Sequence, residues 1–394
     1  MPAARLPADV LATVDTVVAV RRDLHAHPEL SFHEERTARV VADRLRALGL
    51  TPRTGVGGHG VTALLTGAAG PGPTVMLRAD LDALPVTEAA DVPFRSTRPG
   101  VMHACGHDGH SAILLGVAEV LLARRQRLRG QVLLVFQPAE ELPPGGAAAM
   151  LADGVLTDPP VDRAFGLHLW TAAPTGTILV GGGTLWAATA VFRVRLVGRG
   201  GHAALPGETL DPVVAAGRLV VALNELVAPG TRALLAVTTV HAGETFNVVP
   251  ETAELSGTLR AFDRAVLADL ATRLTVTASE VAAATGVRAE VEYREGYPPL
   301  VNDPALAELV RAACAEVVGA EAVGTAVPSF AGEDFARFAQ AVPACFFQVG
   351  TANAAADSTW PHHHPRFALD EDALAIGVAA LAAVAERALS QDGT

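Results

Sequence analysis

Residues 74–85 read Thr-Val-Met-Leu-Arg-Ala-Asp-Leu-Asp-Ala-Leu-Pro, a short apolar run that passes directly into charged residues. The apolar part, Thr74–Leu77, has the length and composition of a buried strand. Helical segments such as Ser111–Arg124 separate several runs of this kind. The other apolar runs are Gln131–Phe136, Ala164–Leu169 and Ala344–Val349. Buried strands that alternate with helices predict an α/β domain with a mixed, largely parallel sheet covered by helices on both faces.

Ionisable residues gather where these predicted strands end. The first strand leads to Arg78–Pro85, the second leads to Gln137-Pro-Ala-Glu-Glu141, and the strand around Phe165 carries His168. Open α/β sheets place their ligand crevice outside the carboxyl ends of the strands. The pattern therefore predicts a functional site at this edge of the sheet.

One stretch, His103-Ala-Cys-Gly-His-Asp-Gly-His110, packs a thiol, three imidazoles and a carboxylate into eight residues. Cys105 and His107 lie two residues apart across a glycine, and both ligand types suit zinc-like or manganese-like ions. Histidine clusters also arise by chance on protein surfaces. Alone, the stretch leaves a metal site and an ordinary polar segment equally open, so further ligands must come from elsewhere.

Two other clusters can supply them. Glu140 and Glu141 are adjacent after Pro138, so one carboxylate could bind a metal while its neighbour acts as a base that is not a ligand. Near the C-terminus, His362-His363-His364 precedes a long apolar helix predicted over Glu371–Leu389. One of these three histidines could complete the site.

The N-terminal segment predicts two helices. The first spans roughly Pro7–His25, and the second follows Ser31, which forms a predicted capping box with Glu34. We assign His25, His27 and His33, which surround this junction, to capping and packing rather than to a metal.

After residue 186 the expected order of strands and helices changes. The expected order of strand, helix, two strands, helix and strand is the split βαβ arrangement of ferredoxin-like domains. These elements are Thr189–Leu196, Asp211–Val227, Ala233–His241, Glu251–Leu259, Arg264–Thr285 and Arg288–Tyr293. We therefore predict a catalytic domain in two segments, 1–186 and 297–394, with a compact domain inserted at 187–296.

The composition excludes several classes of protein. A formal net charge of −12, with no Lys/Arg-rich tract, disfavours a nucleic-acid partner. Three widely spaced cysteines argue against a disulfide framework and for a reducing compartment. Glycines and a proline interrupt the uncharged stretch Ala164–Phe192, which favours a buried segment over a membrane span. Acidic residues interrupt the first apolar run, unlike in a signal peptide, so we expect a cytoplasmic protein with no membrane partner.

A series of short stretches, in one order over nearly the whole chain, resembles the dinuclear metallo-amidohydrolase/peptidase family of hippurate hydrolases, aminoacylases and auxin-conjugate (IAA-amino acid) hydrolases. They are Arg21–Glu29 (RRDLHAHPE), Leu77–Pro85 (LRADLDALP), Met102–His110 (MHACGHDGH), Gln137–Glu141 (QPAEE), Gly166–His168 (GLH), Gly198–Pro206 (GRGGHAALP), Asn247–Pro250 (NVVP), Gly257–Arg260 (GTLR), Tyr297–Asp303 (YPPLVND), Gly332–Phe335 (GEDF) and His363–Phe367 (HHPRF).

The resemblance implies two divalent metal ions, which could be zinc, manganese, cobalt or nickel. The implied metal ligands are Cys105, His107, Glu141, His168 and His363. Cys105 could bridge the two ions by analogy with carboxypeptidase relatives, and the family pattern His-x-Pro-x-Phe selects His363 among the three C-terminal histidines. Glu140 resembles the family's general base, and Asp80 resembles a carboxylate that orients a metal ligand from outside the coordination sphere.

The same resemblance implies that the inserted domain, 187–296, is a dimerisation or lid domain, and it assigns residues of that domain. His202 resembles a histidine that reaches across a homodimer interface to polarise the scissile carbonyl. Asn247 and Arg260 resemble groups that hold the substrate's carboxylate, although Arg260 is equally compatible with an ordinary surface strand residue. Trp186 stands where the family often has a smaller residue, and Ser329–Glu333 matches the family pattern only loosely.

The function implied is metal-dependent hydrolysis of an N-acyl amino acid to a carboxylate and a free amino acid. A dipeptidase or carboxypeptidase with the same site is the first alternative, because pocket shape rather than the metal site decides between them. A non-catalytic metal-binding protein is the second alternative. The presence of Glu140 argues against it, since a protein without catalysis would be free to lose the base.

Overall fold

The structure, a computed structural model, describes residues 6–228 and 230–390. The chain divides into two compact units. The first comprises Met1–Gly183, Val301–Val327 and Asp334–Thr394, and the second comprises Thr184–Leu300 and Pro328–Glu333. The segment 328–333, which the predicted boundaries placed in the catalytic domain, lies in the second unit. There Ser329 forms a β-bridge with Trp186, and the Ala331 carbonyl accepts a hydrogen bond from the Ala187 amide.

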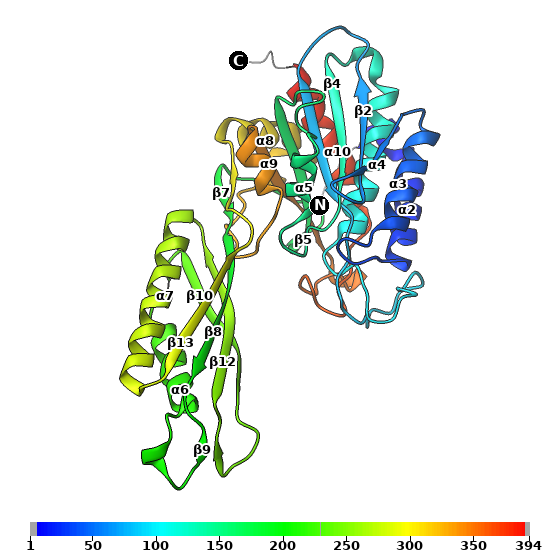
Figure 1. The fold of residues 1–394 in the computed structure, drawn as a ribbon. Helices are drawn as coiled ribbons and strands as arrows, with labels where there is room; N and C mark the ends of the chain where they lie inside the picture. The colour runs from blue at the N-terminus through cyan, green and yellow to red at the C-terminus, as the bar shows by residue number, and fades with distance from the viewer. Residues whose placement is uncertain (1–5, 229, 391–394) are drawn as a thin grey trace. The chain divides into compact units, whose positions relative to one another are not determined.

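The first unit contains an eight-stranded mixed sheet in the order β1-β2-β4-β3-β5-β16-β6-β15 (Figure 1). Its central neighbours β4, β3, β5 and β16 are all parallel, and antiparallel pairs occur toward the edges. The strands are β1 (Arg53–Val56), β2 (Gly60–Thr66), β3 (Thr74–Asp80), β4 (Gln131–Gln137), β5 (Arg163–Pro174), β6 (Ile178–Leu179), β15 (Val323–Gly324) and β16 (Ala344–Ala352). The predicted α/β class is confirmed.

Both faces of this sheet are buried, as its nearly uniform apolar strands require. One face of β3, which carries Val75 and Leu77, joins the main hydrophobic core with the helices α2, α3, α4, α8 and α10. On the opposite face, Phe346 of β16 packs against Phe335, with the ring centroids 5.1 Å apart. The helices are α1 (Ala8–Leu11), α2 (Val14–Ala26), α3 (Glu35–Ala47), α4 (His107–Ala123), α5 (Gly146–Ala152), α8 (Pro304–Val318), α9 (Ala336–Ala341) and α10 (Asp372–Ser390).

Helix α10 is long and apolar enough to cross a membrane by length and composition alone. In the structure, 78% of the most apolar 18-residue stretch of this helix is buried. The helix packs against α4, α8 and α2. A helix that is apolar on all sides and enclosed by other elements is typical of a protein core.

The second unit contains a four-stranded antiparallel sheet in the order β10-β12-β8-β13, with two helices. The chain order of these elements confirms the predicted ferredoxin-like arrangement. Asp211 and Asp263 cap the two helices by accepting backbone hydrogen bonds from their first turns. The elements are β8 (Ala188–Val197), α6 (Pro212–Asn224), β10 (Ala233–Ala242), β12 (Thr252–Ala261), α7 (Arg264–Thr285) and β13 (Arg288–Glu295).

Three local predictions differ from the structure. The helix expected over Pro7–His25 is divided into α1 and α2 around Thr13, whose hydroxyl donates to the Val10 carbonyl. The capping box was wrong, because α3 begins at Glu35 and Ser31 instead donates its hydroxyl to Asp82. Helix α4 begins at His107 rather than Ser111, after Gly106 adopts a left-handed conformation with φ 92°.

Candidate metal centre

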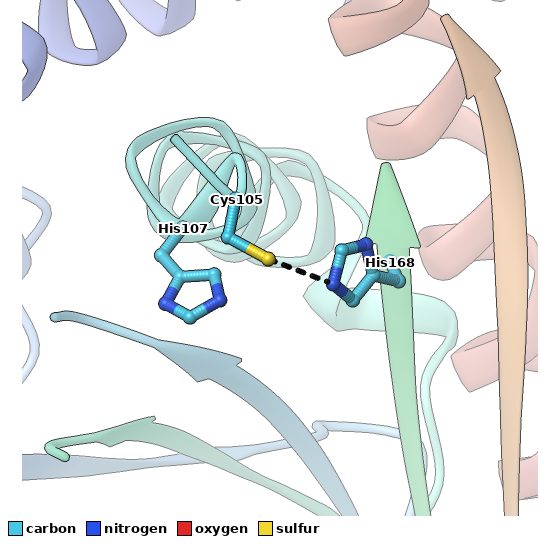
Figure 2. A group of neighbouring side chains, drawn as sticks. All are labelled: Cys105, His107 and His168. Atoms are coloured by element: carbon cyan, nitrogen blue, oxygen red, sulfur yellow. Dashed lines mark hydrogen bonds between the residues drawn. The ribbon is translucent and has the colours of Figure 1, made fainter. Parts of the chain in front are cut away.

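The predicted ligands of the first unit come from four separate segments. Cys105 lies in the loop before α4, and His107 is the first residue of that helix. Glu141 lies in the loop after β4, His168 lies within β5, and His363 lies in the loop before α10. Figure 2 shows the Cys105 side chain directed at the His168 ring, with His107 beside it.

Their donor atoms converge. Cys105 Sγ lies 3.6 Å from His168 Nε2, and Glu141 Oε1 lies 3.3 Å from His363 Nε2. Among the five predicted ligands and Glu140, three groups of donor atoms each lie within 4.8 Å of one another. These groups are Cys105 with His107 and His168, Cys105 with Glu141 and His363, and His107 with Glu140 and Glu141. Because the first two groups share Cys105, the arrangement resembles two adjoining sites with the thiol between them.

The imidazoles are oriented as metal ligands would be. His168 Nδ1 lies 2.8 Å from the Leu169 carbonyl oxygen, and His107 Nδ1 lies 3.0 Å from the Asp82 carbonyl oxygen and 3.2 Å from Asp82 Oδ1. An Nδ1–H that donates to such an acceptor leaves the Nε2 lone pair free for a metal. Glu141 Oε1 is buried and accepts no hydrogen bond within the described ranges 6–228 and 230–390. A cation among these donors would satisfy that oxygen, so the residues fit a divalent metal.

Negative charge dominates the electrostatics. Burial raises the pKa of the Cys105 thiol well above its usual range, and the carboxylates of Glu141 and Glu140 raise it further. Burial alone would lower the pKa of His107, but the nearby Asp80 and Asp82 carboxylates raise it to about 10. Several acidic groups around one thiol are costly unless cations compensate them. Divalent ions would supply that compensation.

Asp80, the last residue of β3, and Asp82, two residues later, have different contacts. Asp80 accepts hydrogen bonds from His110 Nδ1 and Arg78, both at 2.7 Å, and lies 3.7 Å from His107 Nε2. Asp82, which is not among the site residues predicted from the sequence, contacts His107 Nδ1 and so orients this candidate ligand. Its only sequence signal was its place, two residues after Asp80 in the same polar stretch.

Four other histidines of this unit, His25, His110, His362 and His364, are engaged elsewhere. His110 is held between Asp80 and the Leu169 amide, which donates to its Nε2 at 2.9 Å. His362 stacks on Trp170, and His364 stacks on Trp360, which leaves His363 facing Glu141. His25 lies buried between Asp108 and Glu88, 2.8 and 3.1 Å away, consistent with a packing role.

The predicted substrate-contacting residues belong to the second unit. His202 on β9 (Gly201–His202) pairs with Val248 of β11 (Val248–Val249), directly after Asn247. The Ala204 amide donates to His202 Nδ1 at 3.0 Å, so neutral His202 carries its proton on Nε2. Arg260 on β12 is half-buried, and its guanidinium forms no ion pair or hydrogen bond within the described part of the chain. Burial lowers its pKa.

The sequence profile of peptidase family M20/M25/M40 matches residues 76–387. The chain belongs to this family. It is 37% identical over 389 residues to thermostable carboxypeptidase 2 of Saccharolobus solfataricus, with 97% of both chains covered. It is 38% identical to N-acetyl-L-cysteine deacetylase of Bacillus subtilis, with 93% of this chain and 87% of the relative covered.

Solved structures of M20 proteins share the fold. A Bacillus subtilis protein described as a dinuclear metal-binding peptidase of the M20 family superimposes with a TM-score of 0.83 at 34% identity, covering 96% of this chain and 99% of that one. The family resemblance inferred from the sequence motifs is confirmed, and the chain is an M20-family hydrolase.

In this M20 chain, replacing Cys105 by alanine is expected to reduce the bound metal. The thiol belongs to two of the donor groups, so its loss should weaken metal affinity at least by the ~10–100-fold typical of losing a ligand's supporting partner. Elemental analysis after dialysis measures this against Cys345→Ala, which removes a buried thiol from β16. If Cys105→Ala binds metal with the wild-type stoichiometry and affinity, Cys105 is not a metal ligand.

Proposed function

We propose that the chain is a metal-dependent amidohydrolase that cleaves N-acyl amino acids to a carboxylate and a free amino acid. The observation that carries this proposal is the convergence of Cys105, His107, Glu141, His168 and His363 beside a further buried carboxylate, Glu140. A relative named as a deacetylase of an N-acetyl amino acid supports the substrate class. A cytoplasmic location and the absence of a nucleic-acid or membrane partner remain predictions.

These five ligands would hold two divalent ions. When bound, the ions would act as Lewis acids toward the scissile carbonyl and the attacking water. A thiolate, three neutral imidazoles and a carboxylate suit zinc, manganese, cobalt or nickel, so availability can decide among these metals.

The chain's own residues would move the protons. Glu140 takes a proton from the water whose oxygen forms the new bond to the acyl carbon. It then delivers that proton to the amide nitrogen as the carbon–nitrogen bond breaks and the amine leaves. The protonated Nε2 of His202 can donate to the carbonyl oxygen as negative charge develops there.

Arg260, together with Asn247, would bind the substrate's carboxylate. A half-buried guanidinium with no acidic partner among the described residues lacks a counter-ion, and a substrate carboxylate supplies one. This argues for a free α-carboxylate on the substrate.

Arg260→Met is therefore expected to raise KM for an N-acyl amino acid by about 10–100-fold, the loss of one hydrogen bond to a charged group. KM for the corresponding carboxamide should change little. Arg264→Met is the matched control, because Arg264 is an exposed arginine of the same unit paired with Glu295. An equal increase in KM for both substrates would contradict a carboxylate contact.

The proposal is tested by assaying metal-reconstituted protein against a panel of N-acyl amino acids, with dipeptides and C-terminally blocked analogues included. Turnover of acyl amino acids in preference to peptides is the expected result. Preference for peptides would favour the second candidate, a dipeptidase or carboxypeptidase, which a relative named as a carboxypeptidase supports. No turnover of any amide with any of the four metals would overturn both.

The proposal includes a homodimer formed through the second unit, in which each copy supplies His202 to the other copy's site. Mixing His202→Ala and Glu140→Gln protomers should then restore roughly a quarter of wild-type activity, since half of the dimers are mixed and each mixed dimer has one complete site. Each variant alone is the control. Confirmed mixed dimers without restored activity would contradict the exchange of His202.

A further inference from the structure

The loop that carries Glu140 and Glu141 contains a residue in a disfavoured backbone conformation. Ala139, directly before Glu140, has φ 52°, in the left-handed region where the Cβ atom crowds the following carbonyl oxygen. Alanine holds this conformation only where its surroundings enforce it, and such residues cluster at functional sites. The contacts of Ala139 therefore bear on the backbone path of the loop that carries the two glutamates.

Backbone hydrogen bonds hold this loop on both sides of Glu140. The Ala139 amide donates to Glu34 Oε1 at 2.8 Å, and the Ala139 carbonyl accepts from the Gly146 amide at 3.0 Å. The Glu141 amide donates to Asp82 Oδ2 at 2.9 Å. A side chain at residue 146 would place its Cβ 1.9 Å from the Pro138 carbonyl oxygen, so glycine is needed there.

Glu34 does not act as a helix cap, although it immediately precedes α3. Its Oε1 also accepts from the amide of Phe32 at 3.0 Å, and Phe32 is itself left-handed with φ 67°. One carboxylate oxygen thus joins two strained residues that are far apart in the sequence.

The other oxygen, Oε2, is buried and has no hydrogen-bond partner in the described part of the chain. Burial and the nearby Asp82 charge raise the pKa of Glu34 to about 7. Burying a carboxyl group of which only one oxygen accepts hydrogen bonds costs folding free energy, so Glu34 does not serve mainly to stabilise the fold.

We propose that Glu34 is a positioning residue, which fixes the directions of the Glu140 and Glu141 side chains by holding Ala139 in its left-handed conformation. It does not touch the reacting atoms. The proposal rests on the proposed function for the roles of Glu140 and Glu141, and its geometric part can be tested without activity.

The test compares Glu34→Ala, Glu34→Gln and the control Glu35→Ala, whose side chain is exposed on the next residue. Glutamine retains the carbonyl oxygen that accepts both amides, whereas alanine removes it. We expect Glu34→Ala to lower kcat by about tenfold to hundredfold, the scale of a misplaced catalytic group, with KM little changed. Glu34→Gln and Glu35→Ala should stay close to wild type.

A second readout is independent of turnover. In protein reconstituted with Co²⁺ alone, the visible absorption spectrum reports the geometry of the donors. Glu34→Ala should shift this spectrum, because Glu141 moves, while Glu34→Gln and Glu35→Ala should not. If the wild-type protein hydrolyses none of the panel, the proposed function fails, and the cobalt spectra still decide the positioning role.

Glycine at residue 139 provides a further check, and it also covers the case in which Glu34→Ala folds poorly. Glycine adopts a left-handed backbone without a steric clash, so the double variant Glu34→Ala/Ala139→Gly should recover part of the lost kcat and of the cobalt spectrum. Equal losses in Glu34→Gln and Glu34→Ala would overturn the proposal. So would a Glu34→Ala protein with wild-type kcat and spectrum, or a double variant without recovery.

Discussion

Replacing Glu140 by glutamine is expected to lower kcat by a factor of about 10²–10⁴, the usual contribution of a general acid–base group. Glutamine has nearly the same size as glutamate, but it cannot take a proton from water at neutral pH. Glu140 is buried beside the donor cluster and lies with His107 and Glu141 in one group of potential ligand atoms. Steady-state kinetics of the metal-reconstituted variant measures the loss.

Measuring the metal content of the variant distinguishes a general base from a metal ligand. Glu140→Gln should retain the wild-type metal stoichiometry, because the five proposed ligands are unchanged. The control is Glu141→Gln, one residue away, which should lose both metal and turnover, since its buried Oε1 faces His363 and His107. Glu140→Gln protein that turns over at the wild-type rate would refute the base assignment.

Replacing Arg21 by alanine is expected to destabilise the first unit by about 3–5 kcal/mol, the cost of leaving a buried charge without its partner. Arg21 Nε donates to Asp108 Oδ2 at 2.8 Å, and both side chains are almost fully buried. Burial alone would raise the pKa of Asp108, but Arg21 and His25 hold it far below its usual range. Urea denaturation at neutral pH measures the effect.

The control is the adjacent Arg22→Ala. Arg22 pairs with Glu371 on the surface, so its loss should cost about 0–1 kcal/mol. The difference between the two variants should depend on pH. Because the pKa of Asp108 is depressed in the folded state, its stabilisation is complete above the unfolded value of about 3.9 and decreases as the pH falls below it. Equal destabilisation by the two variants would contradict the buried pair.

The general position of the candidate site could be predicted from the sequence. Apolar strands that end in ionisable residues indicate a shared crevice, because neighbouring parallel strands place their carboxyl ends at one edge of the sheet. Asp80 at the end of β3 and the Glu140–Glu141 pair after β4 follow this rule. The choice of His363 needed the family resemblance, since three adjacent histidines on a loop have no periodicity that distinguishes them.

The supporting contacts were not predictable in the same way. Asp82 orients His107, which is 25 residues away in the sequence. Glu34 contacts Ala139, which is 105 residues away. Periodicity describes which face of one element a residue occupies, whereas these contacts depend on where two loops meet. The predicted capping box of Ser31 and Glu34 was wrong for this reason. Ser31 donates its hydroxyl to Asp82, and Glu34 accepts a hydrogen bond from the Ala139 amide, so neither side chain caps the helix.

The position of β16 in the sheet has a consequence for biosynthesis. β16 lies beside β5, yet the whole sequence of the second unit is translated between them. In the emerging chain, β3, β4 and β5 are therefore already synthesised while one edge of β5 has no partner strand. That edge stays unpaired until β16 leaves the ribosome, and the core stays incomplete until α10 follows. An exposed edge and core at this stage favour association between nascent chains. The second unit, nearly continuous in sequence, can complete its own sheet earlier, so we expect it to be the first part to resist proteolysis during synthesis.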